Sequence, residues 1–238
     1  MKIYFITKPQ IIIGIISGII LVFLGFFIVN RLDYGPIEPT TDFSPIYQGS
    51  GEKQQISLAV NVDWGEEFIP DMIKIFNQNK IKCSFFLTGR WTEKFPNIAK
   101  VISQNNHEIG NHGYKHDSTN NMSLEQVKSD IIKTEKIIKS ATGIKTKLYA
   151  PPSGERGEHV LKAARDLGYQ VILWSIDTID WQCPAPQTIM SRVLDKAHNG
   201  AIVLMHPTEP TLKALPGIIR ELKKRGFQFV TVSENIKG

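Results

Sequence analysis

Short apolar runs alternate with longer amphipathic segments along residues 55–238. The runs have the length and composition of strands that are buried on both faces, and the segments between them repeat apolar residues at helical spacing. The predicted strands are residues 56–62, 83–87, 148–150, 171–175, 201–205 and 228–232. The predicted helices are residues 69–79, 95–104, 124–140, 160–167, 188–197 and 212–225.

Helix boundaries in this stretch carry the expected signals. Ser123 and Gln126 have the spacing of a capping box, and Gly143 stands where a helix is expected to end. Strands that alternate with helices form parallel sheets. The pattern therefore predicts an α/β fold, a distorted or incomplete (β/α) barrel of about seven βα units. An open doubly wound sheet is the alternative architecture.

An uncharged apolar run precedes this domain. Residues 11–29 contain no charged side chain, and as a helix they would be roughly 28 Å long, close to the thickness of a bilayer core. No small-residue cleavage site follows the run, which favours an uncleaved transmembrane signal anchor over a cleaved signal peptide or a buried helix.

Charges beside this run predict its orientation. Lys2 and Lys8 precede it and Arg31 follows it, so residues 1–10 are expected in the cytoplasm. Residues 30–54 are rich in Pro, Gly, Thr and Ser and indicate a linker. We expect a single-pass protein of the cell membrane whose domain, residues 55–238, lies outside the cytoplasm.

Charge and cysteine content narrow the function classes. The net charge is +5, but the basic residues are scattered and no nucleic-acid-binding motif is present. Cys83 and Cys183 lie a hundred residues apart, which predicts one buried thiol and one loop thiol. The sequence excludes neither a monomer nor an oligomer.

Polar residues gather where the predicted strands end. In a parallel barrel the carboxyl ends of the strands meet at one face, so these side chains are expected to share a site. Each alone has an ordinary explanation as a surface histidine, a turn cap or a core imidazole, but together they favour a dispersed metal-hydrolase site. They are Asn61, Asp63, His112, His116, Asp177, Asp180 and His206.

Three motifs here resemble those of the polysaccharide deacetylase domain, the NodB-homology domain of carbohydrate esterase family 4. The segment from His112 to His116 is similar to the family's His-x-x-x-His motif, which implies two metal ligands. Asp180 and Trp181 match the fourth motif, and Leu204 and His206 match the fifth. The resemblance implies that His206 is the general acid, oriented by Asp180, and that Trp181 and Leu204 wall an acetyl pocket.

The first motif departs from the family pattern. The family has Thr-Phe-Asp-Asp-Gly, whereas this chain reads Val-Asn-Val-Asp-Trp-Gly from Val60 to Gly65. Matching the glycine makes Asp63 the catalytic base and places Trp64 at a ligand position. Matching the strand instead places Asn61 at the base position and leaves Asp63 as the third metal ligand.

The third motif departs as well. Ala150 replaces the arginine of the family's Arg-Pro-Pro-Tyr-Gly, which pairs with the base aspartate. In the second alignment, Ala150 replaces the family's cation and Asn61 replaces the aspartate that pairs with it. Both charges of the pair are then absent, so neither is buried without a partner, which favours this alignment. The turn through Pro152 and Ser153 is otherwise kept, and both residues are expected at the wall of the substrate site. The backbone N–H of Ser153 is a candidate oxyanion donor.

The resemblance implies a metal-dependent N-deacetylase that releases acetate from a cell-wall or related N-acetylated glycan such as peptidoglycan. Asp63, His112 and His116 would hold a divalent metal, for which three ligands and an open position favour Zn²⁺. Asp63 could also serve as base. Trp91, Tyr114, Tyr149 and Trp181 are candidates for stacking on sugar rings. The alternatives are a catalytically impaired glycan-binding or regulatory module, and a hydrolase of another amide or ester.

The expected topology can be tested on cells stripped of their wall. Protease added outside should remove the domain, because the Pro- and Gly-rich residues 30–54 would be exposed there. Immunoblotting against the domain measures the loss. Full protection would contradict an external domain, whereas a released protein that begins after residue 30 would show a cleaved signal.

Overall fold

The structure, a computed structural model, describes residues 44–238. The expected cytoplasmic segment, transmembrane helix and first part of the linker lie outside these residues. Among residues 44–238, no helix has the length and apolar composition that a membrane span requires.

Strand β1 (Gln55–Val62) is the centre of a parallel sheet, and seven of its eight residues are buried. It pairs with β2 (Ser84–Leu87) on one side and with β7 (Ala201–Met205) on the other. The path of seven strands runs β5-β4-β3-β2-β1-β7-β6, and β8 pairs with β1 off this path. The remaining strands are β3 (Glu108–Asn111), β4 (Leu148–Tyr149), β5 (Gln170–Val171), β6 (Ile176–Asp177) and β8 (Gln228–Phe229).

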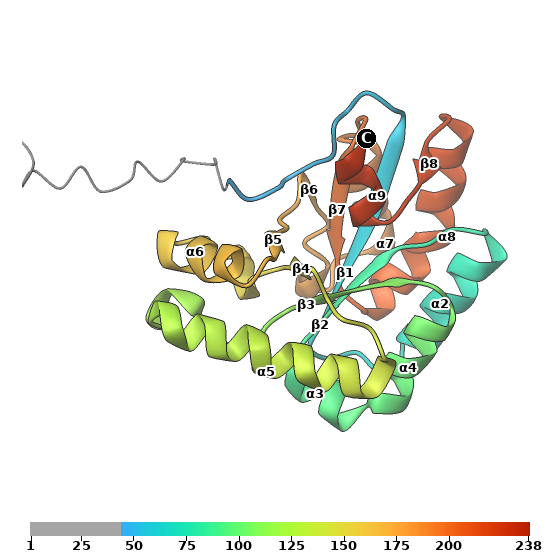
Figure 1. Cartoon of the computed structure of the whole chain (residues 1–238). Helices are drawn as coiled ribbons and strands as arrows, with labels where there is room; N and C mark the ends of the chain where they lie inside the picture. The colour runs from blue at the N-terminus through green and yellow to red at the C-terminus, as the bar shows by residue number, and fades with distance from the viewer. Residues whose placement is uncertain (1–43) are drawn as a thin grey trace, which may run out of the picture. The chain divides into compact units, whose positions relative to one another are not determined.

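Helices between the strands cover the curled sheet, which is open between β5 and β6 (Figure 1). Their apolar faces pack on β1, β2 and β7 in the main core, as expected for parallel strands buried on both faces. The result is a curled parallel half-barrel, in agreement with the predicted distorted barrel. The helices are α2 (Ile69–Gln78), α3 (Gly89–Lys94), α4 (Pro96–Gln104), α5 (Leu124–Thr142), α6 (Glu158–Asp166), α7 (Pro186–Leu194), α8 (Glu209–Lys224) and α9 (Val232–Lys237).

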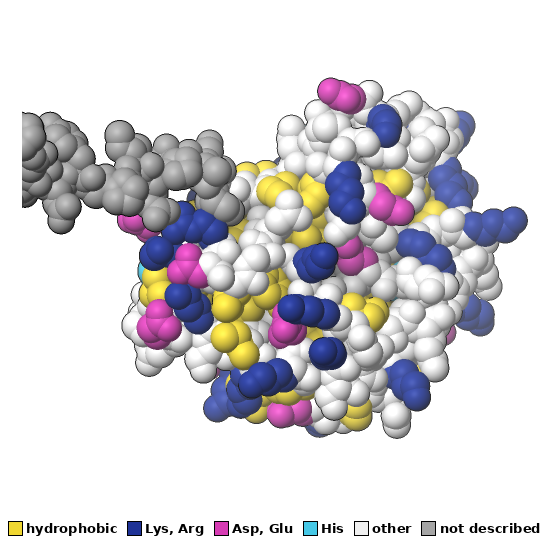
Figure 2. Space-filling model, viewed as in Figure 1, with side chains coloured by type: hydrophobic (Ala, Val, Ile, Leu, Met, Phe, Trp, Pro, Cys, Tyr) yellow, Lys and Arg dark blue, Asp and Glu magenta, His cyan; other side chains and the backbone are white. Residues whose placement is uncertain are grey.

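Several local predictions are confirmed. Ser123 and Gln126 form the capping box of α5, and Gly143 ends this helix with a positive φ of 77°. Cys83 is buried and Cys183 is exposed. Lys and Arg side chains are spread over the face seen in Figure 2, interspersed with other residues, and form no single basic patch there.

The predicted strand at 171–175 was wrong in its extent. The chain leaves the sheet after Val171 and re-enters it at Ile176, so two short strands replace one. Residue Ile46 occupies the gap, because its N–H donates to Val171 and its carbonyl accepts from Leu173.

The predicted strand at 228–232 was also too long. It ends at Phe229, and α9 follows after Thr231, whose side chain forms a capping box with Glu234. The Thr-x-x-Glu spacing was present in the sequence.

Part of the expected linker contacts the sheet. Ile46 forms a parallel bridge with Ile172, and Gln48 forms an antiparallel bridge with Ala201. Gly49 also donates its N–H to the carbonyl of Gly200 at 2.7 Å. Residues 46–49, which we call the strap, therefore run from the end of β5 to the start of β7.

Candidate active site

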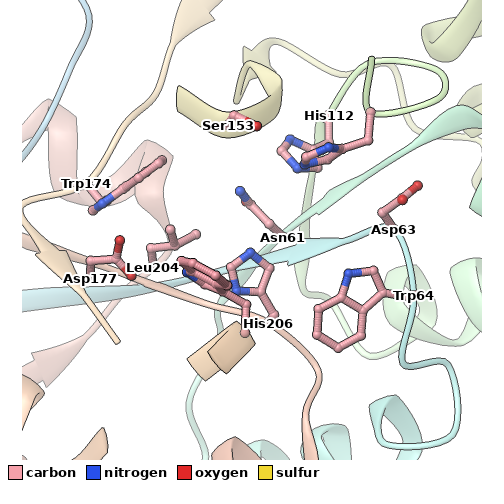
Figure 3. A pocket seen from close by; sticks show the side chains of 11 residues that line it. Asn61, Asp63, Trp64, His112, Ser153, Trp174, Asp177, Leu204 and His206 are labelled. Carbon is pink, nitrogen blue, oxygen red and sulfur yellow. The ribbon is translucent and has the colours of Figure 1, made fainter. Parts of the chain in front are cut away.

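A pocket of about 450 Å³ opens at the carboxyl ends of the strands (Figure 3). It brings together most of the residues that the sequence predicted, although they come from segments far apart in the chain. Its lining consists of Asn61, Asp63, Trp64, His112, His116, Ser153, Trp174, Asp177, Trp181, Leu204 and His206. Pro152, expected at the substrate wall, is buried and does not line the pocket.

His206 and Asp180 form a tightly held pair. The Nδ1 of His206 lies 2.7 Å from Oδ1 of Asp180, and the backbone N–H of His206 donates to Oδ2 at 2.7 Å. Thr211 donates a further hydrogen bond from its hydroxyl to Oδ2 at 2.5 Å. Because the fully buried carboxylate accepts from Nδ1, the Nε2 atom of His206 carries the lone pair and can exchange a proton with a ligand.

The indole of Trp64 covers His206. The two rings stack with centroids 5.9 Å apart and an interplanar angle of 7°, and Trp64 remains 43% exposed. Trp64 therefore lies beside the imidazole as part of the pocket wall, and it does not fill the pocket.

His112 is fixed in one tautomer. Its Nδ1 lies 2.7 Å from the carbonyl oxygen of Ala150, which can only accept, so Nδ1 carries the proton and Nε2 is free to bind a ligand. Burial, with a smaller contribution from His116, lowers the pKa of His112 to about 3. His116 lies beside it, with ring centroids 5.0 Å apart.

Hydrogen bonds within the loop and to α5 hold the loop that carries both histidines. The carboxamide of Asn111 accepts from the N–H of Gly113 and donates to the carbonyl of Ile131, each at 2.9 Å. The N–H of Tyr114 donates to Asp130 at 2.9 Å. These bonds join the loop to α5 and position the two imidazoles.

The carboxylate of Asp63 faces Arg90 and not the two histidines. It accepts from the hydroxyl of Thr88 at 2.8 Å and forms a two-pronged ion pair with Arg90. Figure 3 shows its oxygens directed away from His112. Among the described residues, both carboxylate oxygens are thus already paired with the guanidinium.

Asn61 occupies the middle of the pocket. Its side chain is directed between His112 and His206, and the residue is only 6% exposed (Figure 3). A carboxamide can donate and accept hydrogen bonds, but it cannot take up a proton as a carboxylate base does.

The third motif forms a tight turn in this chain, which has Ala150 at the arginine position. Ser153 adopts a left-handed conformation with φ 55° and ψ 15°, and Gly154 follows with φ 67°. A Cβ atom at Gly154 would lie 2.8 Å from the ring of Trp174, so glycine is required at this close approach. The turn holds Ser153 at the pocket and buries Ala150 behind His112.

A metal fits this arrangement poorly. His112 and His116 are suitable nitrogen donors, and tight catalytic zinc sites have a third protein ligand. Asp63, expected as that ligand, is paired with Arg90. Within residues 44–238, no group of three or more His, Cys, Asp or Glu side chains is arranged to hold a metal ion.

Two contributors to the site, Arg90 and Thr211, carry no signal in the sequence, and two aromatic residues predicted at the site lie in the core. Arg90 lies in the six-residue helix α3, which is too short for a periodic signal, and Thr211 is a helix residue with no motif. Trp91 and Tyr149 are buried, so these two proposed sugar-stacking residues are core residues. Trp181, in contrast, is 56% exposed at the pocket.

Acid should destabilise the domain through His112. Its pKa is about 3 in the folded state and near 6.5 when unfolded, so between these values only the unfolded chain binds the proton. The free energy of unfolding should then decrease with falling pH, by up to about 1.4 kcal/mol per pH unit. Buried His107, with a pKa lowered to about 4 chiefly by burial, adds to the trend.

Urea unfolding between pH 7 and pH 4, with a chelator present, measures this slope. The variant His112→Asn should reduce the slope, because one of the two buried histidines with a lowered pKa no longer contributes. An unchanged slope in that variant would contradict the assignment to His112.

Known proteins resemble this chain in sequence and fold. The polysaccharide deacetylase family model matches residues 48–172, more than half of the chain. A peptidoglycan-N-acetylglucosamine deacetylase of Bacillus cereus is 33% identical over 208 residues, which cover 85% of this chain and 76% of the relative.

A solved structure adds a different kind of relative. BA3943 of Bacillus anthracis, described as a CE4 family pseudoenzyme, is 39% identical with a TM-score of 0.79, covering 81% of this chain and 69% of that one. A mutant of BA3943 described as having restored enzymatic activity is 38% identical, also with a TM-score of 0.79, covering 81% of this chain and 71% of that one. On the family match, the identities and the shared fold, the chain belongs to the polysaccharide deacetylase family.

Proposed function

We propose that this domain binds an N-acetylated glycan of the peptidoglycan type in the pocket and that its hydrolytic turnover is strongly impaired. The observation that carries the proposal is how the polar side chains of the first motif, Asp63 and Asn61, are paired and directed. Asp63 is paired with Arg90, and the neutral Asn61 is directed into the pocket instead.

The lining of the pocket suits an N-acetyl sugar. Trp181 and Trp64 expose aromatic surface on which an apolar sugar face can pack, and Leu204 offers an apolar wall for a methyl group. The carboxamide of Asn61 can bond to the N–H or the carbonyl of an acetamide. The volume of about 450 Å³ is within the usual range for small-molecule sites.

A second hollow continues the pocket. It measures about 190 Å³ and shares Ser153 and Trp174 with the first, and its lining adds Tyr47 and Arg156. A site that extends past one sugar favours a chain of sugars over a small isolated amide.

The missing chemistry supports impairment. Hydrolysis of an amide needs an activated water; Asn61 cannot act as its base, and Asp63, the other candidate base, is paired with Arg90. The family's metal would supply that activation, but the third ligand is held by Arg90. The pseudoenzyme BA3943 is a relative with a similar fold, which supports the same conclusion here.

Active N-deacetylation is the second candidate, favoured by the intact pair of His206 and Asp180. Because Nδ1 of His206 is bonded to Asp180, its Nε2 atom could take up a proton and then donate it to a departing amine. This function needs a divalent metal, which we expect to be zinc, and therefore needs Asp63 to leave Arg90 and join His112 and His116.

The uncharged run at residues 11–29 supports a location of the domain at the outer face of the membrane, next to the cell wall.

We expect the protein to bind the glycan but to release acetate from it only slowly. The full chain in detergent should bind N-acetylglucosamine oligomers in calorimetry, while acetate release should be about 10² to 10⁴ times slower than from the Bacillus cereus relative, the range for loss of a general base. Each assay is run with chelator and with added zinc. Zinc-dependent release at the relative's rate would establish the second candidate, and absence of both binding and release would overturn the glycan site.

Stacking on Trp181 should contribute measurably to glycan affinity. Replacing Trp181 with Ala should weaken binding of the oligomer by about tenfold, since an aromatic contact is worth about 1 kcal/mol or more. Ile132→Ala is the matched control, because Ile132 is also an exposed apolar side chain but lies on α5 and does not line the pocket. Equal affinities of the Trp181 variant and the control would place the sugar elsewhere.

A further inference from the structure

We propose that Arg90 determines whether the pocket can hold a divalent metal, because it competes with the metal for the carboxylate of Asp63. This inference goes beyond glycan binding and does not depend on it. It assigns a role to a residue that lies outside every motif in the sequence.

The ion pair uses the whole carboxylate. The Nε of Arg90 lies 3.1 Å from Oδ1 of Asp63, and the guanidinium also contacts Oδ2. The hydroxyl of Thr88 adds a bond to Oδ1 at 2.8 Å. A planar guanidinium matches a carboxylate in this parallel geometry, which fixes the orientation of both groups.

Backbone bonds keep Arg90 in place. Its N–H donates to the carbonyl of Tyr114, and the N–H of Gly89 donates to that of Gly113, each at 2.9 Å. The N–H of Thr88 donates to Val62 at 3.0 Å. The start of α3 is thus bonded both to the histidine loop and to the end of β1, so the guanidinium emerges next to Asp63.

Charge explains why the pairing matters. The family's third-motif arginine is Ala150 here, and Arg90 supplies a cation to Asp63 from a different segment. A metal that recruited Asp63 would have to separate it from Arg90 and would bring a second positive charge close to the guanidinium. His112 and His116 would otherwise bind the metal with two imidazoles alone, below the usual ligand number of a tight zinc site.

Removing the guanidinium should leave the fold intact. The side chain of Arg90 is 52% exposed, whereas that of Asp63 is 11% exposed. The hydroxyl of Thr88 still donates to Asp63, and the Gln amide can replace one bond of the guanidinium, so Arg90→Gln should remain folded with an unfolding temperature only modestly below that of the parent. Metal binding in this variant can then be compared directly with the parent.

Isothermal titration with Zn²⁺ tests the proposal on the full chain in detergent, without glycan. Arg90→Gln should bind one zinc ion about 10 to 100 times more tightly than the parent, the size of effect that residues around metal ligands usually have. The double variant Arg90→Gln with Asp63→Ala should lose this gain. Arg220→Gln is the matched control, because Arg220 also pairs with a carboxylate, that of Glu221, but Glu221 does not line the pocket as Asp63 does.

Two results would overturn the proposal. One is a folded Arg90→Gln variant that binds zinc no more tightly than the parent, and the other is a parent that already binds zinc tightly and loses it on Asp63→Ala. If Arg90→Gln fails to fold, Arg90→Lys provides the comparison with a smaller expected gain, because an ammonium keeps the charge but cannot bond both carboxylate oxygens in parallel. Glycan affinity measured on the same proteins with chelator reports separately on the proposed glycan site.

Discussion

The parallel pairing of β1 with β2 and β7 is the constraint on which the site depends. Their registers align Val62 with Leu87 and Val60 with Met205. The residues that follow these strands therefore emerge at one edge, where Asp63, Thr88 and His206 approach one another. A shift of one residue in β1 would exchange the faces of Asn61 and Val62 and place an apolar side chain in the pocket.

The carboxylates of Asp180 and Asp63 at that edge of the sheet each have a hydrogen-bonded partner. Asp180 is buried and receives three hydrogen bonds, two from His206 and one from Thr211. Asp63 has a guanidinium as its partner, and Asn61 and Ala150 are both uncharged. The described pocket thus contains no unpaired buried carboxylate, so the altered motifs leave no buried charge uncompensated.

The sequence predicted those parts of the structure that depend on short-range patterns. The alternation of strands and helices, the capping box at Ser123 and the grouping of strand-end histidines all follow from periodicity and spacing. The ion pair between Asp63 and Arg90 could not be predicted, because it joins residues of two segments through side-chain orientation. The strap was missed for a similar reason: residues rich in Gly, Ser and Pro are typical of linkers, and only the vacant edges at Val171 and Ala201 provide its partners.

The strap also has a mechanical consequence. Ile46 and Gly49 are hydrogen-bonded to strand ends, and Tyr47 between them lines the second hollow. A pull on the chain ahead of residue 46 would load these few bonds before it reached the core of the sheet. Detachment of the strap would remove Tyr47 from the hollow while leaving His206, Asp180 and the main core in place, so the width of the hollow would respond to tension along the chain.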